Sequence, residues 1–354
     1  MKTLSTIRAR AARAFTLLEL LVATAIMALI IALLIQVADG TFRSYNAATS
    51  TLRTLATARV VLTNLQQDLQ TAIIPNDRHV WFHVEHTGDI GNLSAASTPQ
   101  IMFFSAVPDR IKRENGQTAR IPGDICAVNY QIAQRSPFIN PGEFSQQTYS
   151  LYRAVIDAKA TFAQAIPAIT GYRQNSTTEA TTKDDALYDL WRTAVDGILD
   201  INNNRAKTDL KSWGIAPQNY LVGDIAGINL VFYYYVAQTD GTKKLTALAH
   251  ADIREDVSNA LRETNPSEIT VETYTKNVKI RAGQVIIDDN ASDDGKTRTL
   301  QSIDVSVICL GPDGALRLRN LQQTASSGRI DPDTFNSILR EHGDTHTVKV
   351  NMAK

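Results

Sequence analysis

The chain has 354 residues with 36 basic and 36 acidic side chains, and 44% of the residues are hydrophobic. This composition is typical of a folded protein and argues against global disorder or a low-complexity fibre. The balanced charge gives no support to a surface devoted to nucleic acid. The two cysteines exclude a disulfide-rich scaffold and a four-cysteine zinc site.

The N-terminus begins with a basic segment. Residues 1–14 contain no acid and four basic side chains: Lys2, Arg8, Arg10 and Arg13. Residues 15–38 then form an apolar run of 24 residues with one charge, Glu19. As a helix of about 1.5 Å per residue the run measures about 36 Å, enough to cross a hydrocarbon core of about 30 Å. We therefore predict a single transmembrane helix, longer than a signal-peptide core, with a cytoplasmic N-terminus and the rest of the chain outside.

Glu19 is unusual because an acid inside a spanning helix costs about 2.5–3.5 kcal/mol on insertion scales and normally has a partner. One interpretation is that it lies close enough to the apolar edge to reach the headgroups. The other is that its carboxylate meets the amino terminus of a processed chain, its own or a neighbour's. These residues alone leave both interpretations open.

The segment Ala14-Phe15-Thr16-Leu17-Leu18-Glu19 resembles the processing site of type IV pilins and type II secretion pseudopilins. In that family a basic leader precedes a small residue, a Phe, a Glu at the fifth mature position and a long apolar helix. The resemblance implies that prepilin peptidase cleaves between Ala14 and Phe15 and methylates the Phe15 amine. It also implies that Glu19 pairs with this amine during assembly with other pilin subunits. The family usually has Gly where this chain has Ala14, and Gln36 stands where major pilins commonly have a proline.

The helix is predicted to continue to about Ile74 and to end at Pro75-Asn76-Asp77. Beyond the membrane segment, apolar residues recur at spacings of three and four. They are Ala48, Leu52, Leu55, Ala58, Leu62, Leu65, Leu69 and Ala72. We interpret this stripe as packing against the following domain, and contact with helices of other subunits is compatible with it. The predicted organisation is a leader (1–14), a transmembrane helix (15–38), an amphipathic continuation (39–74) and an external domain (75–354).

The external domain shows the alternation of β-strands, so the predicted class is α+β with an antiparallel sheet packed on the long helix. The predicted strands cover residues 79–85, 100–106, 124–132, 149–155, 227–237, 276–287 and 302–310. Residues 160–215 are predicted to be an insertion with a helix over 184–201. Asp331-Pro332-Asp333 and Gly343 predict the start and end of a short helix near the C-terminus.

The order of several short segments resembles the minor pseudopilin J of type II secretion. The segments are Leu65-Gln66-Gln67-Asp68-Leu69, Ile101-Met102-Phe103-Phe104-Ser105, Val128-Asn129-Tyr130, Leu151-Tyr152-Arg153 and Asp224-Ile225. The extra length also resembles prepilin-like Verru_Chthon cassette proteins. The resemblance implies a pilin-like fold and a non-catalytic subunit, without cofactor, held in the bacterial inner membrane until it enters a filament.

Two polar clusters contain residue types that can bind metal ions. His79 and His83 share a strand face but lie about 13 Å apart at about 3.3 Å per residue, too far to share one metal. We interpret them, with Glu85 and His86, as a solvated strand face. Three oxygen-bearing residues resemble the opening of a calcium loop: Asn290, Ser292 and Asp294. Because Gln301 stands where the bidentate acid is needed, a turn is favoured over a weak calcium site.

Cys126 and Cys309 each lie on an apolar strand face, and the external compartment permits a disulfide between them. Two buried thiols are the favoured alternative, because sequence does not show proximity.

Tyr233-Tyr234-Tyr235 lacks the basic cluster of a surface that stacks single-stranded nucleic acid. We interpret it as a strand with aromatic residues on both faces, and we expect no nucleic-acid partner. The sequence has no nucleophile elbow, phosphate loop, dinucleotide fingerprint or zinc-protease helix. We therefore expect a structural subunit whose partners are prepilin peptidase, other subunits and the membrane. The alternatives are a membrane-tethered enzyme or binding domain, and an ordinary exported protein.

Overall fold

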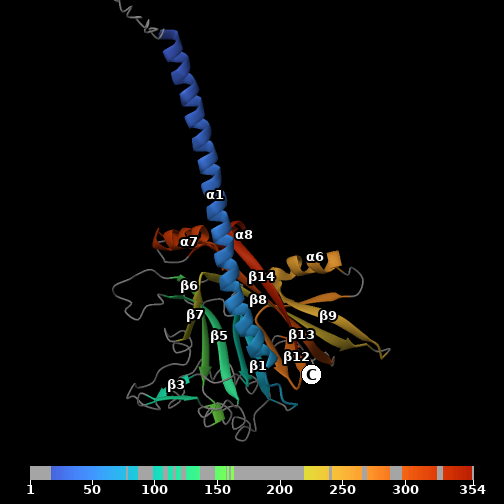
Figure 1. The fold of residues 1–354 in the computed structure, drawn as a ribbon. Coiled ribbons are helices and arrows are strands. Elements are labelled where there is room, and N and C mark those ends of the chain that lie inside the picture. Colours follow the sequence, from blue (N-terminus) through green and yellow to red (C-terminus); the bar gives the residue numbers. More distant parts are fainter. Residues whose placement is uncertain are drawn as a thin grey trace, which may run out of the picture. The chain divides into compact units, whose positions relative to one another are not determined.

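A computed structural model gives the fold of the chain (Figure 1). It describes residues 17–76, 79–86, 99–106, 111–114, 117–120, 125–135, 148–156, 158, 161–162, 219–238, 241–264, 269–287, 297–324 and 330–352. The chain divides into two compact units, Met1–Leu52 and Arg53–Lys354. Helix α1 (Leu17–Gln70) contributes residues to both.

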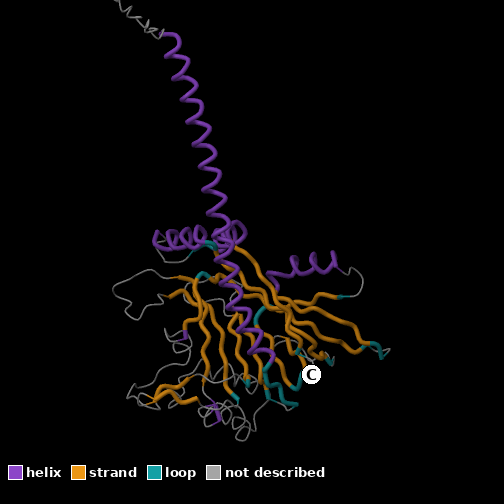
Figure 2. Tube along the Cα trace, in the orientation of Figure 1, coloured by secondary structure: helices purple, strands orange, loops and turns teal. Residues whose placement is uncertain are grey.

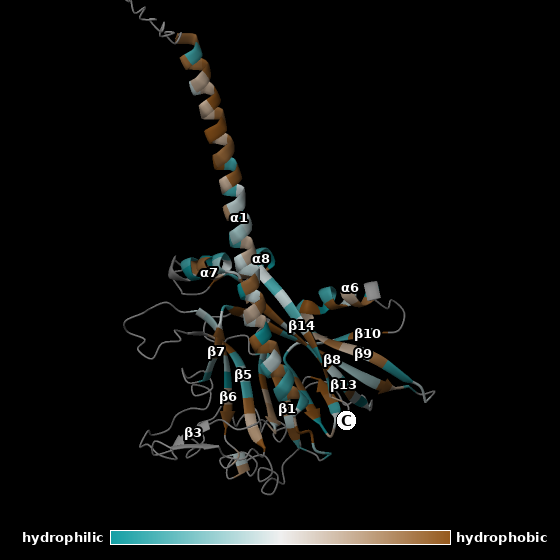
Figure 3. Ribbon diagram, in the orientation of Figure 1, coloured by the Kyte–Doolittle hydropathy of each residue, from teal (hydrophilic) through white to brown (hydrophobic). Residues whose placement is uncertain are grey.

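The described part of the first unit is helical throughout and every large hydrophobic side chain in it is exposed. Figure 3 shows mostly apolar colouring over the earlier turns of α1 and more polar colouring over the turns that follow. Because no proline interrupts it, the backbone ladder is continuous, and Thr24 Oγ1 bonds back to the Leu21 carbonyl at 2.9 Å.

The second unit is built mainly of strands. Those in its first half are β1 (Val80–His86), β2 (Pro99–Ser105), β3 (Ile111–Glu114), β4 (Gln117–Arg120), β5 (Cys126–Arg135) and β6 (Thr148–Ile156). Those in its second half are β7 (Tyr220–Gly223), β8 (Ile225–Ala237), β9 (Lys243–His250), β10 (Thr270–Tyr274), β11 (Asn277–Arg281), β12 (Gln284–Ile287), β13 (Arg298–Leu310) and β14 (Gly343–Asn351). The helical elements are the short η4 (Ala251–Ile253), α6 (Arg254–Thr264), α7 (Pro312–Thr324) and α8 (Pro332–His342).

The described strands form a 12-stranded sheet in the order β10-β9-β8-β13-β12-β11-β1-β2-β5-β6-β7, with β14 paired to β13. Figure 2 shows the strands in orange and the helices in purple. β3 and β4 form a separate hairpin. Strands β7 and β8 are separated only by Asp224, whose φ is +59°. The chain therefore passes from one end of the strand order directly into the third strand from the other end, so the sheet curls back on itself.

One face of this curled sheet encloses the main hydrophobic core. Alternate residues of β8 and β13 enter it, as expected for strand periodicity, and α1 contributes Ala58, Val61, Leu65 and Leu69. A smaller core on the other face joins α6 to β8, β9 and β10.

Two predicted features of the sheet are corrected. Strands β9 and β10 run parallel, so the sheet is mixed, not wholly antiparallel. Helix α6 supplies the crossover that a parallel pair requires. The predicted strand 276–287 is a hairpin, because Ala282 and Gly283 both have positive φ, +51° and +73°, and reverse the chain.

Two helix ends were also predicted. The helix before Gly343 is confirmed: Asp331 accepts a hydrogen bond from the Thr334 N–H at 3.1 Å, and Pro332 occupies the first turn. Helix α1 ends at Gln70, four residues earlier than predicted. The chain turns there because Ala72 pairs with Ser105 in a β-bridge. The helix predicted over 184–201 lies outside the described residues, as do residues 160 and 163–215 of the predicted insertion.

Candidate functional site

The first candidate site is the exposed apolar helix of the first unit. In the described part of the chain α1 is the one helix long and apolar enough to cross a membrane, and its most apolar stretch is 0% buried. Glu19 lies in its first turn. The predicted cleavage pair, Ala14 and Phe15, and the four leader charges lie outside the described residues, as do the calcium candidates Asn290, Ser292 and Asp294.

The apolar stripe of α1 is only partly the face that the second unit buries. The buried residues of α1 are Thr54, Ala58, Val61, Leu65, Asp68 and Leu69, of which Ala58, Leu65 and Leu69 belong to the predicted stripe. By contrast Leu55 is 51% exposed, although the spacing predicts it at the interface. The buried face is therefore rotated from the predicted stripe and includes two polar residues.

The polar residue at the centre of this second site is Asp68. Its side chain is 4% exposed and accepts two hydrogen bonds from Arg153 of β6. Arg153 Nε lies 2.7 Å from Oδ2 and Nη2 lies 2.8 Å from Oδ1, which is the bidentate geometry of a strong charge-assisted pair. The Tyr130 hydroxyl of β5 donates to the same Oδ2 at 2.6 Å.

Backbone contacts extend this Asp68–Tyr130–Arg153 cluster. The Asp68 carbonyl accepts the Ser105 hydroxyl of β2 at 2.7 Å, and Ser105 lies 2.7 Å from the Thr71 hydroxyl. Four segments thus meet at the last turn of α1. The arrangement fixes the register and rotation of the helix end against the sheet.

The electrostatics of the cluster keep Tyr130 protonated and Arg153 charged. Burial and the neighbouring Asp68 carboxylate raise the pKa of Tyr130 well above its ordinary value. Burial acts to lower the pKa of Arg153, but its hydrogen bonds and charge interactions with Asp68 and Tyr130 together outweigh burial, and the pKa is raised. Because every group is paired, the cluster holds no reactive acid, base or nucleophile, and the arrangement is suited to mechanical attachment.

A second polar contact joins α1 to the other end of the unit. Thr54 is 2% exposed, and its hydroxyl donates to Asp344 Oδ2 at 2.6 Å. Asp344 lies at the start of β14. The helix is therefore held by polar contacts near both ends of its buried stretch.

The sequence did not reveal these polar contacts. Asp68, Tyr130 and Arg153 each occur in a short segment of the resemblance described above, but nothing in one sequence showed that they converge. The available signal was Asp68 itself, because an acid three positions after Leu65 is unexpected on a core-facing stripe.

The histidine cluster does not form a solvated face. His83 is 1% exposed, so that prediction is wrong for this residue, because both faces of β1 are covered. His86 instead stacks on His250 with ring centroids 4.1 Å apart, and its Nε2 lies 3.0 Å from the Tyr274 hydroxyl. In the described part of the chain, no three His, Cys, Asp or Glu side chains are grouped as metal ligands.

The two cysteines are both buried and neither is in a disulfide, so the bridge considered from the sequence does not form in this structure. Burial, with smaller effects of Asp344 and Asp224, raises the pKa of the Cys309 thiol to about 12. Tyr233 and Tyr234 point to opposite faces of β8, as the sequence indicated, since they belong to different cores.

Comparison with known proteins locates one match at the N-terminus. Residues 9–35 match the family model described as the prokaryotic N-terminal methylation motif. The match covers both sides of the Ala14–Phe15 junction, Glu19 and most of the apolar run. No curated protein and no solved structure matches the chain. The motif supports a type IV pilin-like protein that is processed by prepilin peptidase and anchored by a single N-terminal helix.

Proposed function

We propose that this chain is a minor pilin-like subunit of a type II secretion or type IV pilus-like filament, most like pseudopilin J. The methylation motif is the observation that carries the proposal, because it joins a basic leader to an apolar helix at a defined junction. The described structure adds a helix whose most apolar stretch is exposed throughout, and a domain that buries the later turns of the same helix.

In this proposal residues 1–14 hold the precursor in the inner membrane, and hydrolysis of the Ala14–Phe15 bond releases the Phe15 amine for methylation. Glu19 of one subunit then pairs with that amine of a neighbour. The apolar helix exchanges lipid for the helices of other subunits, where small residues permit close approach. The second unit remains outside the membrane and carries no catalytic role.

The direct test is the mass of the mature protein from cells with and without active prepilin peptidase. Cleavage shortens the chain by its first 14 residues and leaves one methyl group on Phe15. The same unprocessed mass from both strains would refute the proposal. A soluble product that lacks the whole apolar run would instead indicate an ordinary exported protein.

The assembly role of Glu19 has its own test. Glu19→Ala should leave membrane insertion and cleavage intact and abolish incorporation into filaments, measured by co-sedimentation with sheared filaments. Gln36→Ala is the matched control, because it also removes a polar side chain from the apolar run. Normal incorporation of the Glu19 variant would contradict the pairing.

A further inference from the structure

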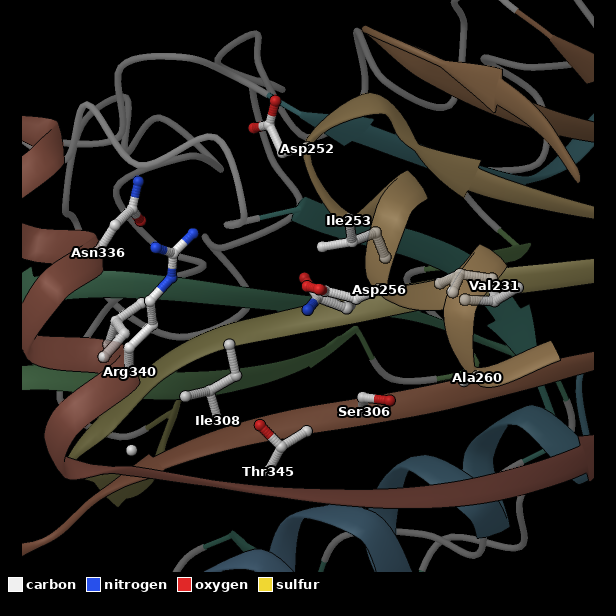
Figure 4. A pocket seen from close by; sticks show the side chains of 14 residues that line it. Val231, Asp252, Ile253, Asp256, Ala260, Ser306, Ile308, Asn336, Arg340 and Thr345 are labelled. Carbon is white, nitrogen blue, oxygen red and sulfur yellow. The ribbon is translucent and has the colours of Figure 1, made fainter. Parts of the chain in front are cut away.

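A groove crosses the outer face of the second unit between α6 and α8 (Figure 4). Its volume is about 630 Å³, within the range of pockets that hold a ligand of several side chains. Strands β8, β13 and β14 form its floor, while η4 with α6 forms one wall and α8 the other. None of its lining residues belongs to the Asp68–Tyr130–Arg153 cluster.

The floor of the groove offers an apolar surface with hydroxyl groups beside it. Val231 and Ile308 supply the apolar part, with Leu339 of the α8 wall beside them, and Ser306 and Thr345 supply the hydroxyls. Such a floor suits a large side chain that is itself mostly apolar, with one polar edge.

The two walls carry opposite charges. Asp252 and Asp256 line the α6 wall, and Arg340 lines the α8 wall (Figure 4). Within the described residues neither Asp256 nor Arg340 forms an ion pair, while Asp252 Oδ2 lies 3.6 Å from His250 Nδ1. The groove thus presents separated positive and negative groups that are available to an occupant of matching polarity.

One exposed turn of the same sequence has this polarity. Asp39 and Arg43 lie one turn apart on α1 and pair at 2.8 Å, with side chains 56% and 81% exposed. Phe42 and Tyr45, beside them, are 68% and 69% exposed. Two exposed aromatic rings beside an acid and a base match a groove with an apolar floor and oppositely charged walls. An exposed ion pair is worth less than about 1 kcal/mol, so Asp39 and Arg43 exchange partners readily.

We propose that the groove of one copy receives the Asp39–Tyr45 turn of another copy. Arg43 faces Asp252 and Asp256, Asp39 faces Arg340, and the Phe42 ring lies on the apolar floor. This contact rests on the proposed assembly function, because it requires two copies to lie side by side in a membrane or filament. It assigns to the second unit a role in ordering neighbours.

The contact is tested by disulfide cross-linking of two differently tagged full-length copies in native membranes. One copy carries Tyr45→Cys and the other Ala260→Cys, a groove residue. We expect a mixed dimer on mild oxidation, and none from the unsubstituted chain, whose two cysteines are buried. Asp256→Arg or Arg43→Glu should each reduce this product about tenfold or more, and the two together should restore it. Failure of the combined reversal to restore cross-linking would overturn the proposal.

A second cross-link separates this contact from the assembly function itself. Leu33→Cys in both copies reports contact between the apolar helices. If this cross-link forms and the Tyr45–Ala260 product does not, groove docking is wrong and assembly stands. If neither forms in processed protein, the proposed function fails and docking fails with it. If both form and only the groove product responds to charge reversal, the docking contact is supported.

Discussion

At the scale of single residues, the most consequential group is the Asp68 carboxylate. It is buried with an arginine and a tyrosine that would each lose a partner without it. Removing one member of a buried pair leaves the other charge unsolvated, which is much more damaging than losing the net interaction. The cluster therefore ties the last turn of α1 to strands β5 and β6.

Asp68→Asn should reduce the free energy of unfolding by about 3–5 kcal/mol, because it strands the Arg153 guanidinium. Urea unfolding of the detergent-solubilised chain, followed by circular dichroism, measures this. Glu341→Gln is the matched control: Arg317 contacts Glu341 at 2.8 Å, but both side chains are more than half exposed. That change should cost less than about 1 kcal/mol. Equal effects of the two substitutions would contradict the assigned role of burial.

The second prediction at this scale concerns the carboxyl group of Asp224. Burial raises the pKa of its carboxyl, with Arg319 acting weakly in the opposite direction. When the pKa of a carboxyl is higher in the folded chain, the folded chain keeps its proton up to a higher pH than the unfolded chain does. The associated stability is therefore present at low pH and is lost as the pH rises through the folded pKa.

Asp224→Asn should accordingly reduce the decline in stability between pH 4 and pH 7 relative to the unsubstituted chain. Unfolding midpoints in urea at intervals of one pH unit provide the measurement. Asn tolerates the φ of +59°, whereas Asp224→Ala should be about 1–2 kcal/mol less stable than the Asn variant at every pH. An unchanged pH profile for the Asn variant would show that the charge of Asp224 is not responsible.

At the scale of elements, the packing of α7 on α8 depends on a glycine. A Cβ placed on Gly314 would lie 2.6 Å from the His342 Cβ, closer than real contacts allow. The two helices approach so closely because Gly314 has no side chain. This reverses the usual rule that alanine is the better helix residue.

Gly314→Ala should destabilise the protein by about 1–3 kcal/mol through overpacking. Gly40→Ala supplies the control, because that glycine is also helical and a Cβ there meets nothing within 4 Å. The control should leave the unfolding midpoint unchanged or higher. A stabilising Gly314 variant would refute the close approach of α7 and α8.

At the scale of the whole molecule, the compact second unit begins at Arg53. The later turns of α1 are part of its core, since Val61, Leu65 and Leu69 are at most 1% exposed. The helix is therefore more than an anchor attached to an independent domain.

A fragment of residues 53–354 should fold and unfold cooperatively, whereas a fragment of residues 75–354 should not. The shorter fragment loses three large core side chains, each worth about 2–5 kcal/mol, and the partner of Arg153. The combined loss matches or exceeds the 5–15 kcal/mol stability of a typical domain. Thermal unfolding followed by near-ultraviolet circular dichroism distinguishes the two. Cooperative unfolding of the shorter fragment at the same temperature would show that the helix is dispensable.

The sequence by itself determined the features that depend on neighbouring residues. The apolar run of α1, the acid within it, most strand positions and the Asp331-capped helix follow from local spacing and composition. The methylation motif is likewise contiguous. The β9–α6–β10 crossover, α7 and the strands β3, β4, β7 and β14 are not predicted, because their segments are short or rich in polar residues and give weak patterns.

Tertiary structure decided which residues meet. Leu55 and Leu65 have the same local character, yet only Leu65 is buried, because the curled sheet covers one side of the helix. Tyr130 and Arg153 lie 62 and 85 positions after Asp68 along the chain, and only strand pairing brings them within hydrogen-bond distance of it. Local spacing governs which elements form, whereas long-range packing governs which face is buried and which polar groups pair.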